Sequence, residues 1–75
     1  MKNEINYLQL QKDIVDRVSI KKALIKSANQ STIESIISDI AFDLSQIYEK
    51  DFDFDVHRDI YESAMDLIKS KEFWV

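Results

Sequence analysis

The chain has 75 residues and contains neither glycine nor proline. At average usage, a chain of this length would carry roughly five glycines and four prolines. Tight β-hairpin turns need backbone angles that glycine adopts most readily, so a β-rich fold is hard to build here. Phosphate-binding loops, dinucleotide-binding motifs and nucleophile elbows also depend on glycine, and those enzyme classes are excluded. We therefore expect an all-α fold whose helices are joined by Asn, Ser and Asp turns.

The chain also lacks cysteine and has a single histidine, His57. Disulfides, thiolate zinc sites and cysteine nucleophiles are thereby excluded, and multi-histidine metal sites are too. Apolar residues make up 45% and charged residues 32%, which is typical of a folded domain rather than a disordered tail. We expect one domain, residues 1–75, that needs no cofactor or metal and is not an enzyme.

Apolar residues recur at helical spacing in three segments, which predicts helices over 3–28, 32–50 and 55–72. A straight first helix would be about 39 Å long, so it either overhangs its partners or breaks near Ser19. Asn29 is expected to end it in a left-handed conformation. Ser31 and Glu34 form a predicted capping box at the start of the second helix. The prediction is a compact three-helix bundle, with a fourth helix if the first one breaks.

The third predicted helix is apolar around about half of its circumference, so we expect it to lie between the other two. Asp53 or Asp55 is predicted to cap its start. The apolar residues at the C-terminus, Phe73, Trp74 and Val75, are expected to fold back over the core. His57, Phe52 and Phe54 are predicted to be buried.

The charge is unevenly distributed along the chain. Residues 1–26 carry a net charge of +3, whereas residues 34–66 contain ten acids opposed only by Lys50 and Arg58. Such a field repels nucleic acid and attracts basic surfaces, although a solvated face is the plainer explanation. The sequence contains no apolar run of the ~18 residues typical of a membrane span, and its start lacks a signal-peptide pattern. We therefore expect a cytoplasmic protein that does not bind membranes.

Phe42 is the candidate anchor of a partner-binding site. At about 100° per residue, it falls opposite the apolar stripe of the second predicted helix. An aromatic side chain with a polar rim is typical of a protein-interaction hot spot. Alternatively, Phe42 is buried by the first helix, or by a second copy of the chain in a homodimer. The other predicted partner-binding residues are polar: Ser38, Asp39, Asp43, Gln46 and Glu49.

Residues 51–62 have the acid spacing of a calcium-binding EF-hand loop. The sixth position of such a loop needs glycine, and here it is Val56, which is poorly suited to positive φ. The eighth position is Arg58 rather than an aliphatic residue. The acids of this pattern are Asp51, Asp53, Asp55, Asp59 and Glu62. We interpret them as the acid-rich N-terminus of a helix and expect no metal to bind there.

The size and acidity of the chain favour a non-catalytic interaction protein. Small acidic helical proteins include antitoxins, immunity proteins and phage inhibitors of nucleic-acid-handling enzymes, to which this chain is similar in size and charge. The corresponding hypothesis is a stoichiometric inhibitor that occupies a basic surface of a partner protein. In its most concrete form the carboxylates mimic DNA phosphates and occupy the partner's cationic groove.

The alternative function rests on residues 23–36, ALIKSANQSTIESI. This segment resembles the helix-turn-helix of Cro- and repressor-type DNA-binding proteins, with Ala23 as the small residue of the first helix. The resemblance implies a DNA-binding element over residues 19–37. Ser27 stands where the family usually has glycine, and the second helix carries no Lys or Arg before Lys50, although DNA binding depends on phosphate neutralisation. The implied DNA contacts are Lys21, Lys22, Lys26, Gln30, Ser31 and Thr32.

Overall fold

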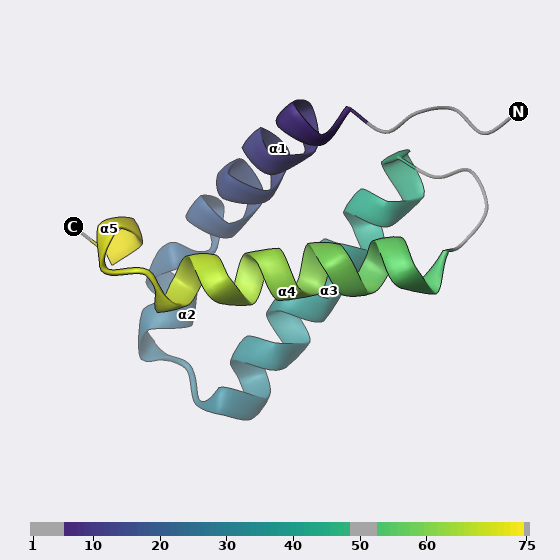
Figure 1. The fold of residues 1–75 in the computed structure, drawn as a ribbon. Helices are drawn as coiled ribbons and strands as arrows, with labels where there is room; N and C mark the ends of the chain where they lie inside the picture. Colours follow the sequence, from purple (N-terminus) through teal and green to yellow (C-terminus); the bar gives the residue numbers. More distant parts are fainter. Residues whose placement is uncertain (1–5, 49–52, 75) are drawn as a thin grey trace, which may run out of the picture.

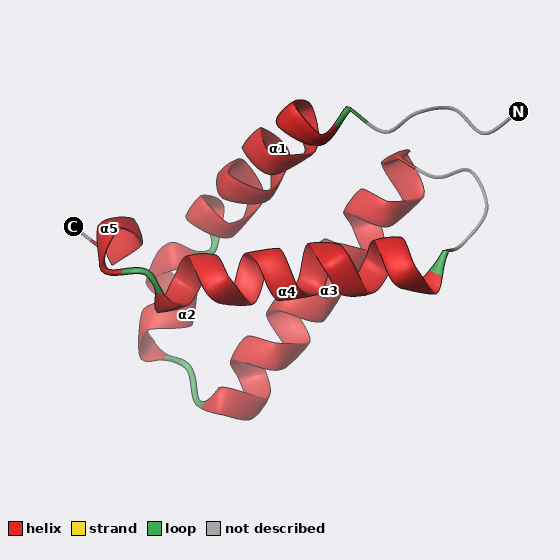
Figure 2. Cartoon of the chain, viewed as in Figure 1, coloured by secondary structure: helices red, strands yellow, loops and turns green. Residues whose placement is uncertain are grey.

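All regular secondary structure described for this chain is α-helix. The computed structural model describes residues 6–48 and 53–74 (Figure 1). These ranges contain helices and no strand (Figure 2), which confirms the predicted all-α bundle. The helices are α1 (Tyr7–Ile20), α2 (Lys22–Ser27), α3 (Gln30–Tyr48), α4 (Phe54–Lys69) and α5 (Lys71–Trp74).

The three long helices share one core. α4 packs against both α3 and α1, as expected, but α1 and α3 also contact each other directly. α4 crosses α3 in Figure 1, while α2 closes one end of the bundle and α5 packs on α4. None of the helices described here combines the length and apolar character that a membrane span requires. The core residues come from four helices: Leu10, Ile14, Val18, Ile25, Ile37, Ile40, Ala41, Leu44, Ile60 and Ala64.

The first predicted helix is broken at Lys21, two residues beyond Ser19. Lys21 has φ −94° and ψ 6°, and its N–H donates to the Val18 carbonyl at 3.1 Å. The three residues before it, Val18 to Ile20, are weaker helix formers than Ala or Leu, which makes a break inexpensive there. The new direction brings Ile25 of α2 into the core, where only 2% of it is exposed. The four-helix alternative is therefore the one adopted, and α5 adds a fifth helix.

The start of α3 differs from the prediction. The Thr32 N–H donates to Asn29 Oδ1 at 2.8 Å, so Asn29 is the capping residue and α3 begins at Gln30. The predicted Ser31 cap is wrong because the Asn29 side chain already fills that role. The left-handed Asn29 is also wrong, since no described residue has positive φ. Ala28 instead turns the chain in an extended conformation, with φ −88° and ψ 154°.

Asp53 caps α4, which confirms one of the two predicted caps. Its Oδ1 accepts hydrogen bonds from the backbone N–H groups of Asp55 and Val56, at 2.9 and 3.3 Å. α4 ends at Lys69, before the predicted residue 72, because Ser70 is extended. The acid-rich segment is thus helical from Phe54 onward, rather than an open loop around a cation.

The C-terminal segment folds back over the core, as predicted for Phe73 and Trp74. Both side chains are half-buried against the core, with their rings edge to face at 4.9 Å between centroids. The Trp74 indole N–H donates to the Ile68 carbonyl at 2.6 Å. α5 is thereby fixed to the last turns of α4. Val75 lies outside the described residues.

Two residues that continue the helical spacing of the apolar residues, and would be expected in the core on that pattern, are exposed. Tyr7 lies in the first turn of α1 and Ile47 in the last turn of α3, and both side chains are more than half exposed. These two helix ends lie away from the crossing α4 in Figure 1, so α4 leaves them uncovered. His57 is half-buried rather than part of the core.

Candidate protein-interaction surface

An open groove lies between α3 and the first half of α4. Its volume is about 230 Å³. Ser38 supplies the α3 wall. The α4 residues follow the i, i+3, i+4, i+7 spacing of a single helix face, so they form one continuous wall. They are Phe54, His57, Arg58 and Tyr61.

Two phenylalanines are exposed beside or within this groove. Phe42 follows Ser38 by one helical turn and therefore lies on the same face of α3. It is 48% exposed, so about half of its surface is open. Phe54 is 64% exposed, and its predicted burial is wrong. Phe54 lies six residues before the buried Ile60, about 120° around the helix, and this spacing could have revealed its exposure.

We use the name α3–α4 aromatic surface for the groove residues together with Phe42. Of the predicted rim residues, Ser38 is half-buried in the groove wall and Gln46 is exposed one turn beyond Phe42. Ser45, the neighbour of Gln46, is 1% exposed and donates its hydroxyl to the Phe42 carbonyl at 2.9 Å. Ser45 therefore belongs to the buried side of α3. The predicted contact Glu49 lies outside the described residues.

Asp39 and Asp43 lie on the other side of Phe42, toward α1. They line a separate groove of about 530 Å³ together with Ile20 and two cationic residues of the α1 end, Arg17 and Lys21. The two acids therefore have positive charges within the same groove. The predicted partner-binding residues thus divide between two grooves, with Phe42 between them.

The α4 side of the aromatic surface has a mixed but acidic rim. Arg58 and Asp55 form an ion pair at 3.2 Å, with side chains 53% and 76% exposed. An exposed pair of this kind stabilises the fold by roughly 0–1 kcal/mol, so it restrains Arg58 only weakly. Asp59 and Glu62 are also exposed on α4. A basic partner would therefore meet carboxylates next to the exposed aromatic rings.

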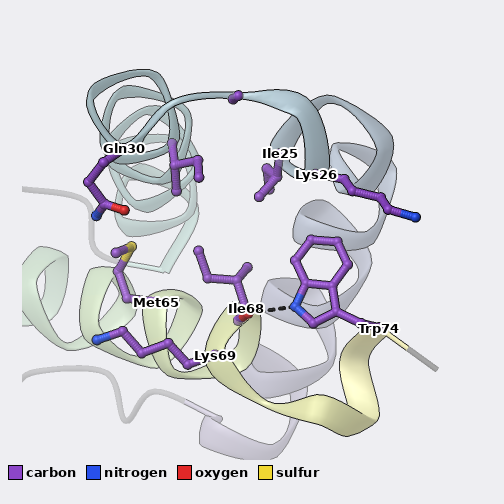
Figure 3. Close-up of a pocket in the computed structure, with 9 residues that line it drawn as sticks. Ile25, Lys26, Gln30, Met65, Ile68, Lys69 and Trp74 are labelled. Atoms are coloured by element: carbon purple, nitrogen blue, oxygen red, sulfur yellow. Dashed lines mark hydrogen bonds between the residues drawn. The ribbon is translucent and has the colours of Figure 1, made fainter.

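The structure brings the residues of the predicted DNA-binding element together only in part. Lys21 lines the groove that contains Asp39 and Asp43. Lys22 is half-buried, and its ammonium lies over the rings of α5. Lys26 and Gln30 line a third pocket (Figure 3). Ser31 and Thr32 are exposed in the first turn of α3.

The described residues offer no metal centre. Residues 6–48 and 53–74 contain no group of three His, Cys, Asp or Glu residues that could hold a metal ion. Asp53, which the calcium pattern places third, accepts two backbone hydrogen bonds as a helix cap.

No match was found when the chain was compared with protein-family models, with curated proteins and with solved structures.

Proposed function

We propose that this chain is a non-catalytic module that binds a basic surface of a protein partner through the α3–α4 aromatic surface. The observation that carries the proposal is the exposure of Phe42 and Phe54, at 48% and 64%, within the acidic half of the chain. In its most concrete form the module is a stoichiometric inhibitor that covers a nucleic-acid-binding surface of its partner.

The size of the groove supports a protein partner. Small-molecule sites usually enclose at least about 300 Å³, whereas this open groove has about 230 Å³. A groove of this size suits one apolar or basic side chain from another protein. Aromatic anchors that become buried on binding commonly carry most of the binding free energy.

The charges support the choice of a basic partner. Asp55 forms an ion pair with the groove residue Arg58 at 3.2 Å, and the segment 34–66 has a net charge of −8. Complementary charges accelerate association and help to reject wrong partners. Added salt should therefore slow association more than it speeds dissociation.

The test is capture from nuclease-treated bacterial lysate by the immobilised chain, followed by binding measurements on the purified partner. We expect Phe42→Asp and Phe54→Asp to weaken binding at least about tenfold, as is typical of hot-spot substitutions. Leu8→Asp is the matched control, because Leu8 is 80% exposed on α1, outside the aromatic surface.

Equal loss of binding in all three variants would contradict the proposed surface, as would full binding by both phenylalanine variants. Retention of DNA from untreated lysate, abolished by nuclease and by Lys26→Gln but not by Phe42→Asp, would instead support the helix-turn-helix alternative.

A further inference from the structure

The third pocket, which Lys26 and Gln30 line, lies at the opposite end of α4 from Phe54, where α2, α3, α4 and the C-terminal segment meet (Figure 3). Its volume is about 460 Å³. This value lies within the range of about 300–1,000 Å³ that is usual for small-molecule sites. The walls are largely apolar, because Ile25, Ile33, Met65, Ile68 and Trp74 line the pocket. Met65 lies across the pocket from Trp74, and Ile25 and Ile68 lie beside the indole (Figure 3).

The polar groups at this pocket are cationic or neutral. Lys26 and Lys69 lie on opposite sides of the pocket with their ammonium groups directed outward (Figure 3), and Gln30 is the remaining polar side chain. No Asp or Glu is among the described residues that line it. The pocket is therefore positively charged in a chain whose net charge is −4.

The Trp74 wall is held in place without a ligand. The indole N–H donates to the Ile68 carbonyl at 2.6 Å, which fixes the ring relative to α4. The Lys22 ammonium lies 5.9 Å from the Trp74 ring centroid and 4.9 Å from that of Phe73. A preformed wall lowers the entropy lost when a ligand binds.

We propose that this pocket binds a small amphiphile with one anionic head group, of the class of medium-chain carboxylates. The apolar chain would lie among the isoleucines, Met65 and Trp74. The carboxylate would leave the pocket beside Lys26 or Lys69, whose flexible side chains can follow it. Charge complementarity selects the anion, because the flanking charges are both positive. This site is separate from the α3–α4 aromatic surface and does not depend on the function proposed there.

The experiment is a fluorescence titration of the full chain with decanoate, below its micelle-forming concentration. Trp74 is the only tryptophan of the chain, so its emission reports directly on the pocket. Decanol and decylammonium are the matched probes, with the same apolar chain but a neutral or positive head. We expect saturable changes in emission, with affinity falling from decanoate to decanol to decylammonium.

Two charge variants locate the head group. Lys26→Met and Lys69→Met each remove one charge and keep a side chain of similar length. Lys26 and Lys69 are both exposed, so the fold should be retained in these variants. The variant at the lysine that contacts the carboxylate is expected to weaken decanoate binding about two- to fivefold, as is typical of one exposed charge contact, and both should leave decanol binding unchanged. Unchanged decanoate binding in both variants would contradict the proposal. Lys12→Met is the control, because Lys12 is exposed on α1, away from this pocket.

Three further outcomes would overturn the proposal. The first is the absence of a saturable response of Trp74 to decanoate. The second is equal affinity for the three probes, which would show that charge is not recognised. The third is a loss of decanoate affinity in Lys12→Met as large as the larger of the losses in the two pocket variants.

Discussion

The Tyr48 hydroxyl, in the last turn of α3, donates a hydrogen bond to the Asp13 carboxylate on α1. The two residues are 35 positions apart, so this bond joins the middle of α1 to the last turn of α3, where Ile47 is exposed. The hydrogen bond to Asp13, the loss of solvent and the negative charge of Asp13 together raise the pKa of Tyr48 to about 12.

The bundle should lose stability at alkaline pH through Tyr48. Its ordinary pKa is 10.0 and its folded-state pKa is about 12, so folding favours the neutral phenol. This contribution is fully present below pH 10 and is lost as the pH rises toward about 12. We expect the melting temperature to fall over this interval, and a late-titrating tyrosine to be visible in the phenolate absorbance.

Two variants separate this effect from general alkaline unfolding. Tyr48→Phe should remove the late-titrating absorbance and flatten the dependence of the melting temperature on pH in this interval. Asp13→Asn should lower the pKa of Tyr48, since it removes the negative charge next to the phenol. A late-titrating absorbance that persists in Tyr48→Phe would contradict the assignment.

The start of α3 provides a test of the observed cap against the predicted one. Asn29→Ala removes the oxygen that accepts from the Thr32 N–H and should cost about 0.5–2 kcal/mol of unfolding free energy. Ser31 is exposed in the first turn of α3, so Ser31→Ala should change the unfolding free energy by less than about 0.5 kcal/mol. Urea unfolding followed by circular dichroism measures both, and the opposite ranking would restore Ser31 as the cap.

Much of the fold could be predicted because local rules decide it. The lack of glycine and proline argued against β-hairpins, and periodic isoleucines and leucines marked the faces that became the core. Asp53 is a cap for the reason that was predicted, since its side chain accepts from the free N–H groups of α4. The break in the first helix was foreseen as an alternative because a straight helix would outreach its partners.

The errors arose where tertiary packing decides. Ile47 continues the apolar stripe of α3, but the sequence pattern does not reveal that α4 crosses α3 away from this last turn and leaves Ile47 exposed. Ser31 and Asn29 are both good caps, and only the extended Ala28 places Asn29 at the correct position. The pocket lined by Trp74 forms only because α5 turns back at Ser70. Its lining residues are spread from position 25 to position 74, so the sequence pattern could not reveal it.

The loss of unfolding free energy when an isoleucine is replaced should depend on how deeply that isoleucine is buried. Ile60 is 1% exposed in the shared core, and Ile60→Ala should lower the unfolding free energy by about 2–5 kcal/mol. Ile20 is 76% exposed at the end of α1, and Ile20→Ala should change it by less than about 0.5 kcal/mol. Urea unfolding of the pair measures this contrast. Similar costs for the two variants would mean that Ile20 is covered in solution, for instance by a second copy of the chain.

Lys22 should help to hold α5 in place, because its ammonium lies 4.9 Å from the Phe73 ring centroid and 5.9 Å from that of Trp74. Such contacts contribute about 0.5–1 kcal/mol at exposed sites. Lys22→Gln should therefore shift the Trp74 emission to the red and increase its quenching by acrylamide, a neutral quencher. Lys21→Gln removes the same charge one residue earlier, where the side chain lines the Asp39 groove, and should leave both signals unchanged. Equal effects of the two substitutions would mean that net charge, rather than the contact with the rings, sets the position of α5.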